Sequence, residues 1–347
     1  MQSKIWKPYQ LTKKIELKNR IVMAPLTRCF ADHHLRPSDL ALNYYVKRAD
    51  AGLIISEATI IEPIGQGYPN TPGIFTKEQI SAWGKIVEAI HKAGGLIFLQ
   101  LWHTGRVSHP IYHSGNLPVS ASAIALEGNV PRQKGLQYGK PRPLSTLEVR
   151  ETIESFTKAA QNAISAGFDG IEIHGANGYL IDQFIHACCN KRNDSYGGSI
   201  ENRARMPIEI IENISDKLGP DRIGIRLSPG SYYNMTHSDG DEEVFIHLFK
   251  KIEEYNLAYV HLGIFDDSME FDYLGGRASS FIRKHYSGTL ISCGKYTIEQ
   301  AESEINENKI DLAAFGRPFI ANPDFINRSK NDLPLLEYDE SMLNELI

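Results

Sequence analysis

Short apolar segments recur along the chain, and each is followed by a segment with the spacing of an amphipathic helix. Most of the apolar segments contain β-branched residues and end in polar or glycine-containing loops, which is typical of buried strands. The predicted strands span residues 20–26, 53–59, 96–102, 170–174, 223–228, 258–263, 289–293 and 312–316. Strands that alternate with helices in this way predict an α/β fold, a closed (β/α)8 TIM barrel.

The starts of three predicted helices support this alternation. Thr76, Ser145 and Thr297 are each followed three residues later by Glu or Gln, the pattern of a capping box. The longest connection, about residues 104–144, is rich in Pro, Gly, Ser and His and predicts an extended loop or hairpin inserted after the third strand. Because no G-x-G-x-x-G follows the first strand, we prefer the barrel to an open doubly wound sheet. No linker is apparent, so we expect one domain over residues 1–347.

Composition narrows the class of function. The chain has 347 residues, 42% of them hydrophobic, and a formal net charge of −5, which gives no indication of nucleic-acid or membrane partners. Its apolar runs are too short to cross a bilayer, and its N-terminus lacks a hydrophobic signal core. We therefore expect a cytoplasmic protein.

The four cysteines do not have the spacing of a metal site. Cys29, Cys188, Cys189 and Cys293 form no C-x-x-C pair and no zinc or iron–sulfur pattern. We expect neither a metal nor a disulfide framework.

The densest group of reactive side chains follows the fourth predicted strand, within Gly170–Tyr179. His174 and Asn177 can both donate hydrogen bonds to one substrate oxygen, and Tyr179 can donate a proton to a neighbouring atom. Two polarising donors and one acid suit a reaction that places negative charge on a carbonyl or nitro group and then protonates carbon.

Other polar residues also lie at strand ends, which in a barrel meet at one mouth. The turns Ser292–Thr297 and Ala314–Pro318 contain glycines that expose backbone N–H groups, and Arg317 adds a fixed charge, as expected of a phosphate site. Arg226, Gln100 and Thr27 would line a flat ligand with polar edges. Flavin mononucleotide (FMN) fits this set, with Arg226 near the N1/O2 side of the ring, Gln100 at the pyrimidine edge and Thr27 near O4/N5.

Long motifs in a fixed order then identify a family. The chain resembles the Old Yellow Enzyme family of FMN-dependent ene-reductases over roughly residues 4–335. The motifs that carry the resemblance include Asn19–Arg28, Ser56–Thr59, Gly65–Tyr68, Gln100–His103, Phe168–Phe184, Asp194–Ser199, Arg226–Pro229 and Phe315–Pro323. Position 27 is Thr rather than Cys, and in this the chain resembles the larger, classical branch of the family.

The resemblance implies a role for individual residues. The implied FMN contacts are Pro25, Leu26, Thr27, Ala58, Gln100 and Arg226, with the phosphate held by Gly294, Lys295, Gly316 and Arg317. His174 and Asn177 would bind the substrate oxygen, Tyr179 would be the proton donor, and Tyr68 and Trp102 would line the pocket. NADPH or NADH would supply the hydride, and an activated alkene or nitro compound would receive it in the same place. A C-terminal segment that in the family lends a Tyr to the pocket is absent from Leu333–Ile347.

Several readings stay open from the sequence. A flavin-free barrel lyase or isomerase that binds a sugar phosphate is the main alternative, although Lys295 is the only obvious strand-end lysine for it. A flavin-binding protein without activity is another. The sequence does not determine the physiological substrate, which could equally be a quinone or a nitrate ester. It does not choose between NADPH and NADH, or between a monomer and a homodimer.

Overall fold

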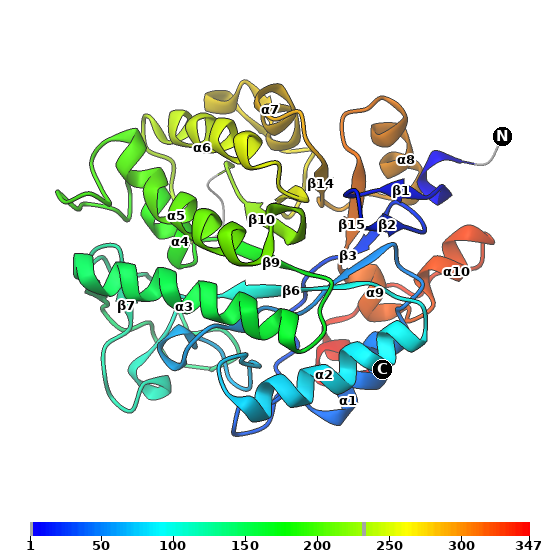
Figure 1. Ribbon diagram of the computed structural model, residues 1–347, viewed down its shortest axis with the longest axis horizontal. Coiled ribbons are helices and arrows are strands. Elements are labelled where there is room, and N and C mark those ends of the chain that lie inside the picture. The colour runs from blue at the N-terminus through cyan, green and yellow to red at the C-terminus, as the bar shows by residue number, and fades with distance from the viewer. Residues whose placement is uncertain (1–2, 231–233) are drawn as a thin grey trace.

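Eight parallel strands close into a barrel at the centre of the computed structural model, which describes residues 3–230 and 234–347 (Figure 1). The ring runs in the order β3, β4, β6, β9, β10, β11, β14, β15, and β15 pairs back onto β3. These strands are β3 (Ile21–Met23), β4 (Leu53–Ile55), β6 (Ile97–Trp102), β9 (Gly170–Gly175), β10 (Ile223–Leu227), β11 (Tyr259–Leu262), β14 (Leu290–Ser292) and β15 (Leu312–Phe315). The predicted TIM barrel is confirmed.

All eight predicted strands form. Most are one or two residues shorter than predicted, and β3 and β4 are each four residues shorter. β3 ends at Met23, just before Pro25, which has no N–H to continue the strand ladder. The predicted strand 53–59 divides into β4 and the short β5 (Thr59–Ile60), which pairs with the end of β6. The chain leaves the barrel at Ser56, whose hydroxyl donates to the backbone carbonyl of Glu57.

Helices surround the ring (Figure 1). All three predicted capping boxes are present, at Thr76, Ser145 and Thr297. The helices are α1 (Asp39–Val46), α2 (Lys77–Lys92), α3 (Thr146–Ser165), α4 (Leu180–Ile185), α5 (Ile200–Leu218), α6 (Asp241–Tyr255), α7 (Ala278–His285), α8 (Ile298–Asn306), α9 (Arg317–Ala321) and α10 (Phe325–Lys330).

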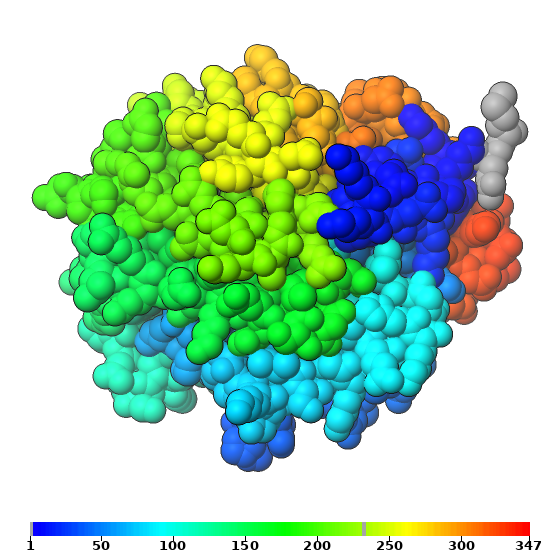
Figure 2. Space-filling model, in the orientation of Figure 1, coloured from blue at the N-terminus to red at the C-terminus, as the bar shows by residue number. Residues whose placement is uncertain are grey.

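The barrel interior is closed at its N-terminal end by the first residues of the chain. The hairpin β1 (Tyr9–Gln10) and β2 (Glu16–Leu17) places Leu11 and Leu17 against interior strand residues such as Phe98. In Figure 2 this dark blue segment covers part of the visible face. The bottom of the barrel is therefore packed, and we expect a ligand to enter from the opposite end, where the strands finish.

The connections after the strands carry the remaining short elements. His103–Ser145, between β6 and α3, contains a 3-10 turn (Pro110–Tyr112) and the paired strands β7 (Val119–Ser120) and β8 (Arg142–Pro143). After β11 come β12 (Glu270–Phe271) and β13 (Gly276–Arg277). Among the described residues, no helix has both the length and the apolar character needed to cross a membrane.

Candidate active site

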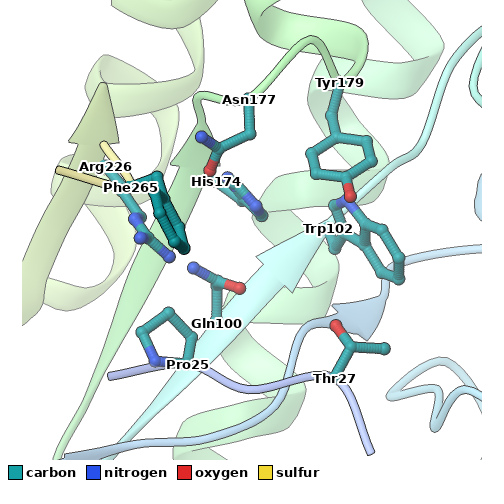
Figure 3. Close-up of a pocket in the computed structure, with 9 residues that line it drawn as sticks. All are labelled: Pro25, Thr27, Gln100, Trp102, His174, Asn177, Tyr179, Arg226 and Phe265. Atoms are coloured by element: carbon teal, nitrogen blue, oxygen red, sulfur yellow. The ribbon is translucent and has the colours of Figure 1, made fainter. Parts of the chain in front are cut away.

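A cavity of about 430 Å³ opens where the strands end. In Figure 3, His174 and Asn177 enter it from the end of β9, and the Tyr179 hydroxyl lies beside the Trp102 indole. Arg226 and Phe265 lie on the opposite side of the cavity, and Gln100 lies between these two sides. The residues lining this cavity, called the substrate cavity below, are Pro25, Thr27, Gln100, Trp102, His174, Asn177, Tyr179, Arg226 and Phe265.

His174 is a neutral imidazole in this cavity. Its pKa lies well below the usual 6.5, because burial disfavours the charged form and the positive charges of Arg226 and His261 add to the effect. The ring is 5% exposed, and its buried Nδ1 has no hydrogen-bond partner among the described residues. A neutral ring with an unused nitrogen can bind a ligand oxygen without adding a net charge to the pocket.

The loop that carries Asn177 is held from below by a buried carboxylate. Asn177 has a left-handed backbone, with φ of +60°, and its backbone N–H donates to Ser228 Oγ at 2.9 Å. Asp182 Oδ2 accepts from the Gly178 N–H at 2.9 Å and from Ser228 Oγ at 3.1 Å. The Asn177 side-chain nitrogen donates to the Gly263 carbonyl at 3.1 Å, which leaves its second N–H for a ligand.

Tyr179 stands in an aromatic wall. Its hydroxyl lies 2.8 Å from the hydroxyl of Tyr68, and its ring makes an edge contact with Trp102 at a centroid distance of 4.9 Å. Only 8% of Tyr179 is exposed. The two phenols thus form a short hydrogen-bonded pair through which a proton can pass from the pocket wall to a bound molecule.

Below the cavity, the strands carry a layer of charged side chains. Glu172 accepts a hydrogen bond from Gln100 Nε2 at 2.7 Å and contacts His261 Nδ1 at 2.8 Å. Burial alone would raise the pKa of Glu172, but His261, Arg226 and Gln100 outweigh it and keep the pKa below its usual range. Burial likewise favours a lower pKa for His261, and Glu172 reverses this and raises it. This buried ion pair fixes the orientation of Gln100 beneath the cavity.

A second cavity, of about 630 Å³, adjoins the first and shares Pro25, Arg226 and Phe265 with it. We call it the cofactor cavity. Its other lining residues come from the ends of β3, β11, β14 and β15, from α9 and from the C-terminal segment: Ala24, Leu26, Ile264, Cys293, Gly294, Lys295, Tyr296, Ala314, Phe315, Gly316, Arg317, Pro318, Asn322 and Leu335–Tyr338.

The far end of the cofactor cavity has the features of a phosphate site. Gly294 has φ of +146°, and a Cβ added there would lie 2.4 Å from the backbone nitrogen of Asp267, so only glycine fits. The Arg317 guanidinium lies between the rings of Phe265 and Tyr338, at 4.9 Å and 5.2 Å from their centroids. FMN has a phosphate, a flexible linker and a flat ring with hydrogen-bonding edges, and the two cavities fit such a molecule. The Arg317 cation lies at the phosphate end, and Arg226 and the Gln100 carboxamide lie toward the ring end.

The structure brings most of the predicted site residues together. The cofactor cavity is lined by Leu26, Gly294, Lys295, Gly316 and Arg317. All other predicted site residues except Ala58 and Tyr68 line the substrate cavity. Ala58 and Tyr68 pack with Trp102 and Tyr179 in the wall behind it. His103, which follows β6, lines neither cavity: its Nε2 is 3.6 Å from Glu62, and burial lowers its pKa to about 3.

Sequence reasoning missed Phe265, Glu172 and His261. Glu172 and His261 are polar residues inside buried strands, which is a signal that could have been used. Phe265 lies in an irregular segment after β11 and has no such signal.

The C-terminal segment does reach the site, but Tyr338 contacts Arg317 in the cofactor cavity and does not line the substrate cavity. Within residues 3–230 and 234–347 there is no His, Cys, Asp and Glu group that could hold a metal ion.

Comparison with known proteins gives a consistent result. A family model described as the NADH:flavin oxidoreductase / NADH oxidase family matches residues 4–335. The chain is 41% identical to 12-oxophytodienoate reductase 1 of Oryza sativa subsp. japonica over 342 residues, which are 96% of this chain and 88% of that protein. It is 39% identical to the flavin oxidoreductase hxnT of Emericella nidulans, covering 94% of this chain and 90% of that one.

Solved structures agree over almost the full length. Morphinone reductase in complex with tetrahydroNAD superposes with a TM-score of 0.89 at 41% identity, covering 98% of this chain and 93% of that one. An old yellow enzyme homologue from Zymomonas mobilis superposes with a TM-score of 0.91 at 38% identity, covering 98% and 96%.

Proposed function

The chain belongs to the NADH:flavin oxidoreductase / NADH oxidase family, and we propose that its substrate cavity reduces the activated C=C bond of α,β-unsaturated carbonyl compounds. As a member of the Old Yellow Enzyme family it is an FMN-dependent ene-reductase that takes reducing equivalents from NAD(P)H. The flavin-free lyase or isomerase is not favoured. Bound FMN supplies the site that accepts a hydride from NAD(P)H and passes it to the alkene.

The observation that carries the proposal is the grouping of His174, Asn177 and Tyr179 at one side of a single cavity. Neutral His174 and the free N–H of Asn177 bind the carbonyl oxygen of the substrate and stabilise the negative charge that develops there. Tyr179 then protonates the α-carbon, and Tyr68, 2.8 Å away, supports this transfer. A carbonyl is the group we favour over a nitro group, because the names of two relatives refer to a ketone-bearing compound.

The cofactor is held by residues of both cavities. Pro25, Leu26 and Thr27 follow β3 along one side of the ring site, and Ala58 supports it from behind. Gln100 and Arg226 would meet its polar edge. Backbone N–H groups of Gly294, Lys295 and Gly316, together with the Arg317 side chain, would hold the phosphate. The nicotinamide of NAD(P)H would use the substrate cavity in turn. In support of a nicotinamide partner, morphinone reductase is described in complex with tetrahydroNAD.

An isotope experiment tests the proposal. The enzyme is given 2-cyclohexenone and NADPH carrying deuterium at the transferable position, or unlabelled NADPH in D2O. We expect cyclohexanone with deuterium at the β-carbon in the first case and at the α-carbon in the second. Nitroalkenes, quinones and nitrate esters form the comparison panel. Turnover of nitroalkenes with none of enones would contradict the assigned substrate class.

A further inference from the structure

Three sulfur atoms meet at the end of the segment that follows α4, outside both cavities. Cys188 Sγ lies 3.3 Å from Cys189 Sγ, and Cys189 Sγ lies 3.4 Å from the Met235 thioether. The two cysteines are neighbours in sequence, yet their side chains turn to the same side. Neither residue lines the substrate cavity or the cofactor cavity.

The two thiols differ in environment. Cys189 is fully buried, whereas Cys188 is partly exposed to solvent. The hydrogen bond from Cys189 and further bonds from Thr236, against the opposing effect of burial, lower the pKa of Cys188 to about 5. The same hydrogen bond, together with burial, raises the pKa of Cys189. This arrangement places an accessible thiolate beside a protonated partner.

The remaining cysteines provide the contrast. Cys29 is also partly exposed, but burial of its sulfur raises its pKa to about 12, and no second cysteine lies beside it. Cys293 is buried in the wall of the cofactor cavity, where its Sγ contacts the carbonyl of Leu262 at 2.9 Å. Among the four cysteines, Cys188 alone combines access, a resolving thiol and thiolate character.

From this geometry we infer that Cys188 and Cys189 are a redox-reactive dithiol that hydroperoxides convert to a reversible disulfide. The Cys188 thiolate attacks the distal peroxide oxygen, the O–O bond breaks, and the alcohol or water leaves as Cys188 becomes a sulfenic acid. Cys189 then attacks the Cys188 sulfur, the S–OH bond breaks, and water leaves with the thiol proton. Overall, two thiols and one hydroperoxide give one disulfide, one alcohol or water and one water.

The resulting disulfide is expected to be easily reduced. Adjacent Cα atoms are about 3.8 Å apart across a trans peptide, which is shorter than the roughly 4.4–6.8 Å that disulfides favour. The bond therefore strains the local backbone, including the hydrogen bond from the Cys189 N–H to the His186 carbonyl. Strained disulfides have high reduction potentials and belong to the labile class.

Peptide mapping tests the inference on the FMN-loaded enzyme. After treatment with hydrogen peroxide, we expect the peptide containing both cysteines to lose the mass of two hydrogen atoms and to recover it with dithiothreitol. The thiol count of the unfolded protein should fall from four to two. Without oxidant, Cys188 should be alkylated at least about tenfold faster than Cys29 near neutral pH, because the pKa of Cys188 is lowered whereas that of Cys29 is raised.

Two variants separate a dithiol from two independent cysteines. In Cys189→Ser, peroxide should drive Cys188 to sulfinic acid, which dithiothreitol does not reverse. Cys29→Ser is the matched control and should form the disulfide as the wild type does. A wild type that retains four thiols, or whose Cys188 is overoxidised as in Cys189→Ser, would overturn the inference. The peptide map of the wild type alone shows whether the disulfide between Cys188 and Cys189 forms. The test therefore still decides the question if a variant folds poorly.

Discussion

Tyr179 is the residue on which the second half of the proposed reaction depends. Replacing it with Phe removes the proton donor but leaves the aromatic wall, so reduction of bound FMN by NAD(P)H should continue at the wild-type rate. Reduction of 2-cyclohexenone should fall by roughly 10²–10⁴-fold, the usual contribution of a positioned acid. Stopped-flow measurement of flavin absorbance separates the two steps.

Tyr68 provides the matched control for this variant. Tyr68→Phe deletes the partner hydroxyl at 2.8 Å while keeping Tyr179, and we expect less than about a tenfold loss of alkene reduction. Equal alkene turnover in Tyr179→Phe and the wild type would remove Tyr179 from the mechanism.

Phe265 is expected to limit the size of the substrate. It lines both cavities on the same side as Arg226, and it is 47% exposed. Phe265→Ala should raise the kcat/KM ratio of a polycyclic enone to 2-cyclohexenone at least about tenfold, since pocket contacts of this size discriminate by 10–200-fold. Phe265→Leu should give an intermediate ratio. An unchanged ratio in both variants would show that Phe265 does not limit the pocket.

At the scale of elements, the turn between β14 and α8 should control cofactor affinity. Gly294→Ala places a Cβ against Asp267 at a backbone φ of +146°, with strain of roughly 1–3 kcal/mol. We expect the dissociation constant of FMN, measured by quenching of flavin fluorescence, to rise about tenfold or more.

Gly275→Ala is the control for Gly294→Ala. Gly275 also has a left-handed backbone, with φ of +69°, but a Cβ there meets nothing within 4 Å. That variant should lose some stability and keep the wild-type FMN affinity. If both variants bind FMN as the wild type does, the turn does not form the phosphate site.

A buried histidine links the elements beneath the catalytic loop. His186, after α4, contacts Asp182 at 3.2 Å and Asp241 of α6 at 2.9 Å, and Asp241 also pairs with Arg203 of α5. Burial lowers the pKa of His186, but the two aspartates outweigh this effect and raise it to about 10. Since Asp182 also holds the backbone of Gly178, this network supports the loop that carries Asn177.

The raised pKa of His186 predicts how stability depends on pH. The folded protein keeps the proton up to about pH 10, whereas the unfolded chain loses it near 6.5, so this contribution is complete below pH 6.5. It is lost at up to about 1.4 kcal/mol per pH unit as the pH rises toward the folded pKa. In urea unfolding, His186→Gln should be less stable at pH 6.5 and show a flatter decline above it. His247→Gln should keep the wild-type slope, and an equal slope in His186→Gln would refute the assignment.

The elements also explain what could be predicted from the sequence. Strands such as Ile97–Trp102 are apolar except for one residue, Gln100, and capping boxes are local patterns, so both can be predicted directly from the sequence. The residues proposed as catalytic could be predicted because they follow strand ends, and the structure brings them to one cavity. The sequence does not show that Glu172 and His261 form a pair. Their contact depends on the register of β9, β10 and β11, which decides which interior side chains meet. Phe265 belongs to an irregular segment, whose path is decided by tertiary contacts.

For the whole molecule, the central claim is that the barrel mouth binds FMN and uses it to pass hydride from NAD(P)H to an alkene. The most direct measurement is the visible absorption spectrum of the purified protein, followed without oxygen through additions of NADPH or NADH and then 2-cyclohexenone. We predict a yellow protein whose flavin bands bleach with the nicotinamide and return with the enone, but not with cyclohexanone. A colourless protein that cannot be reconstituted with FMN, or a reduced flavin that no activated alkene reoxidises, would contradict the account.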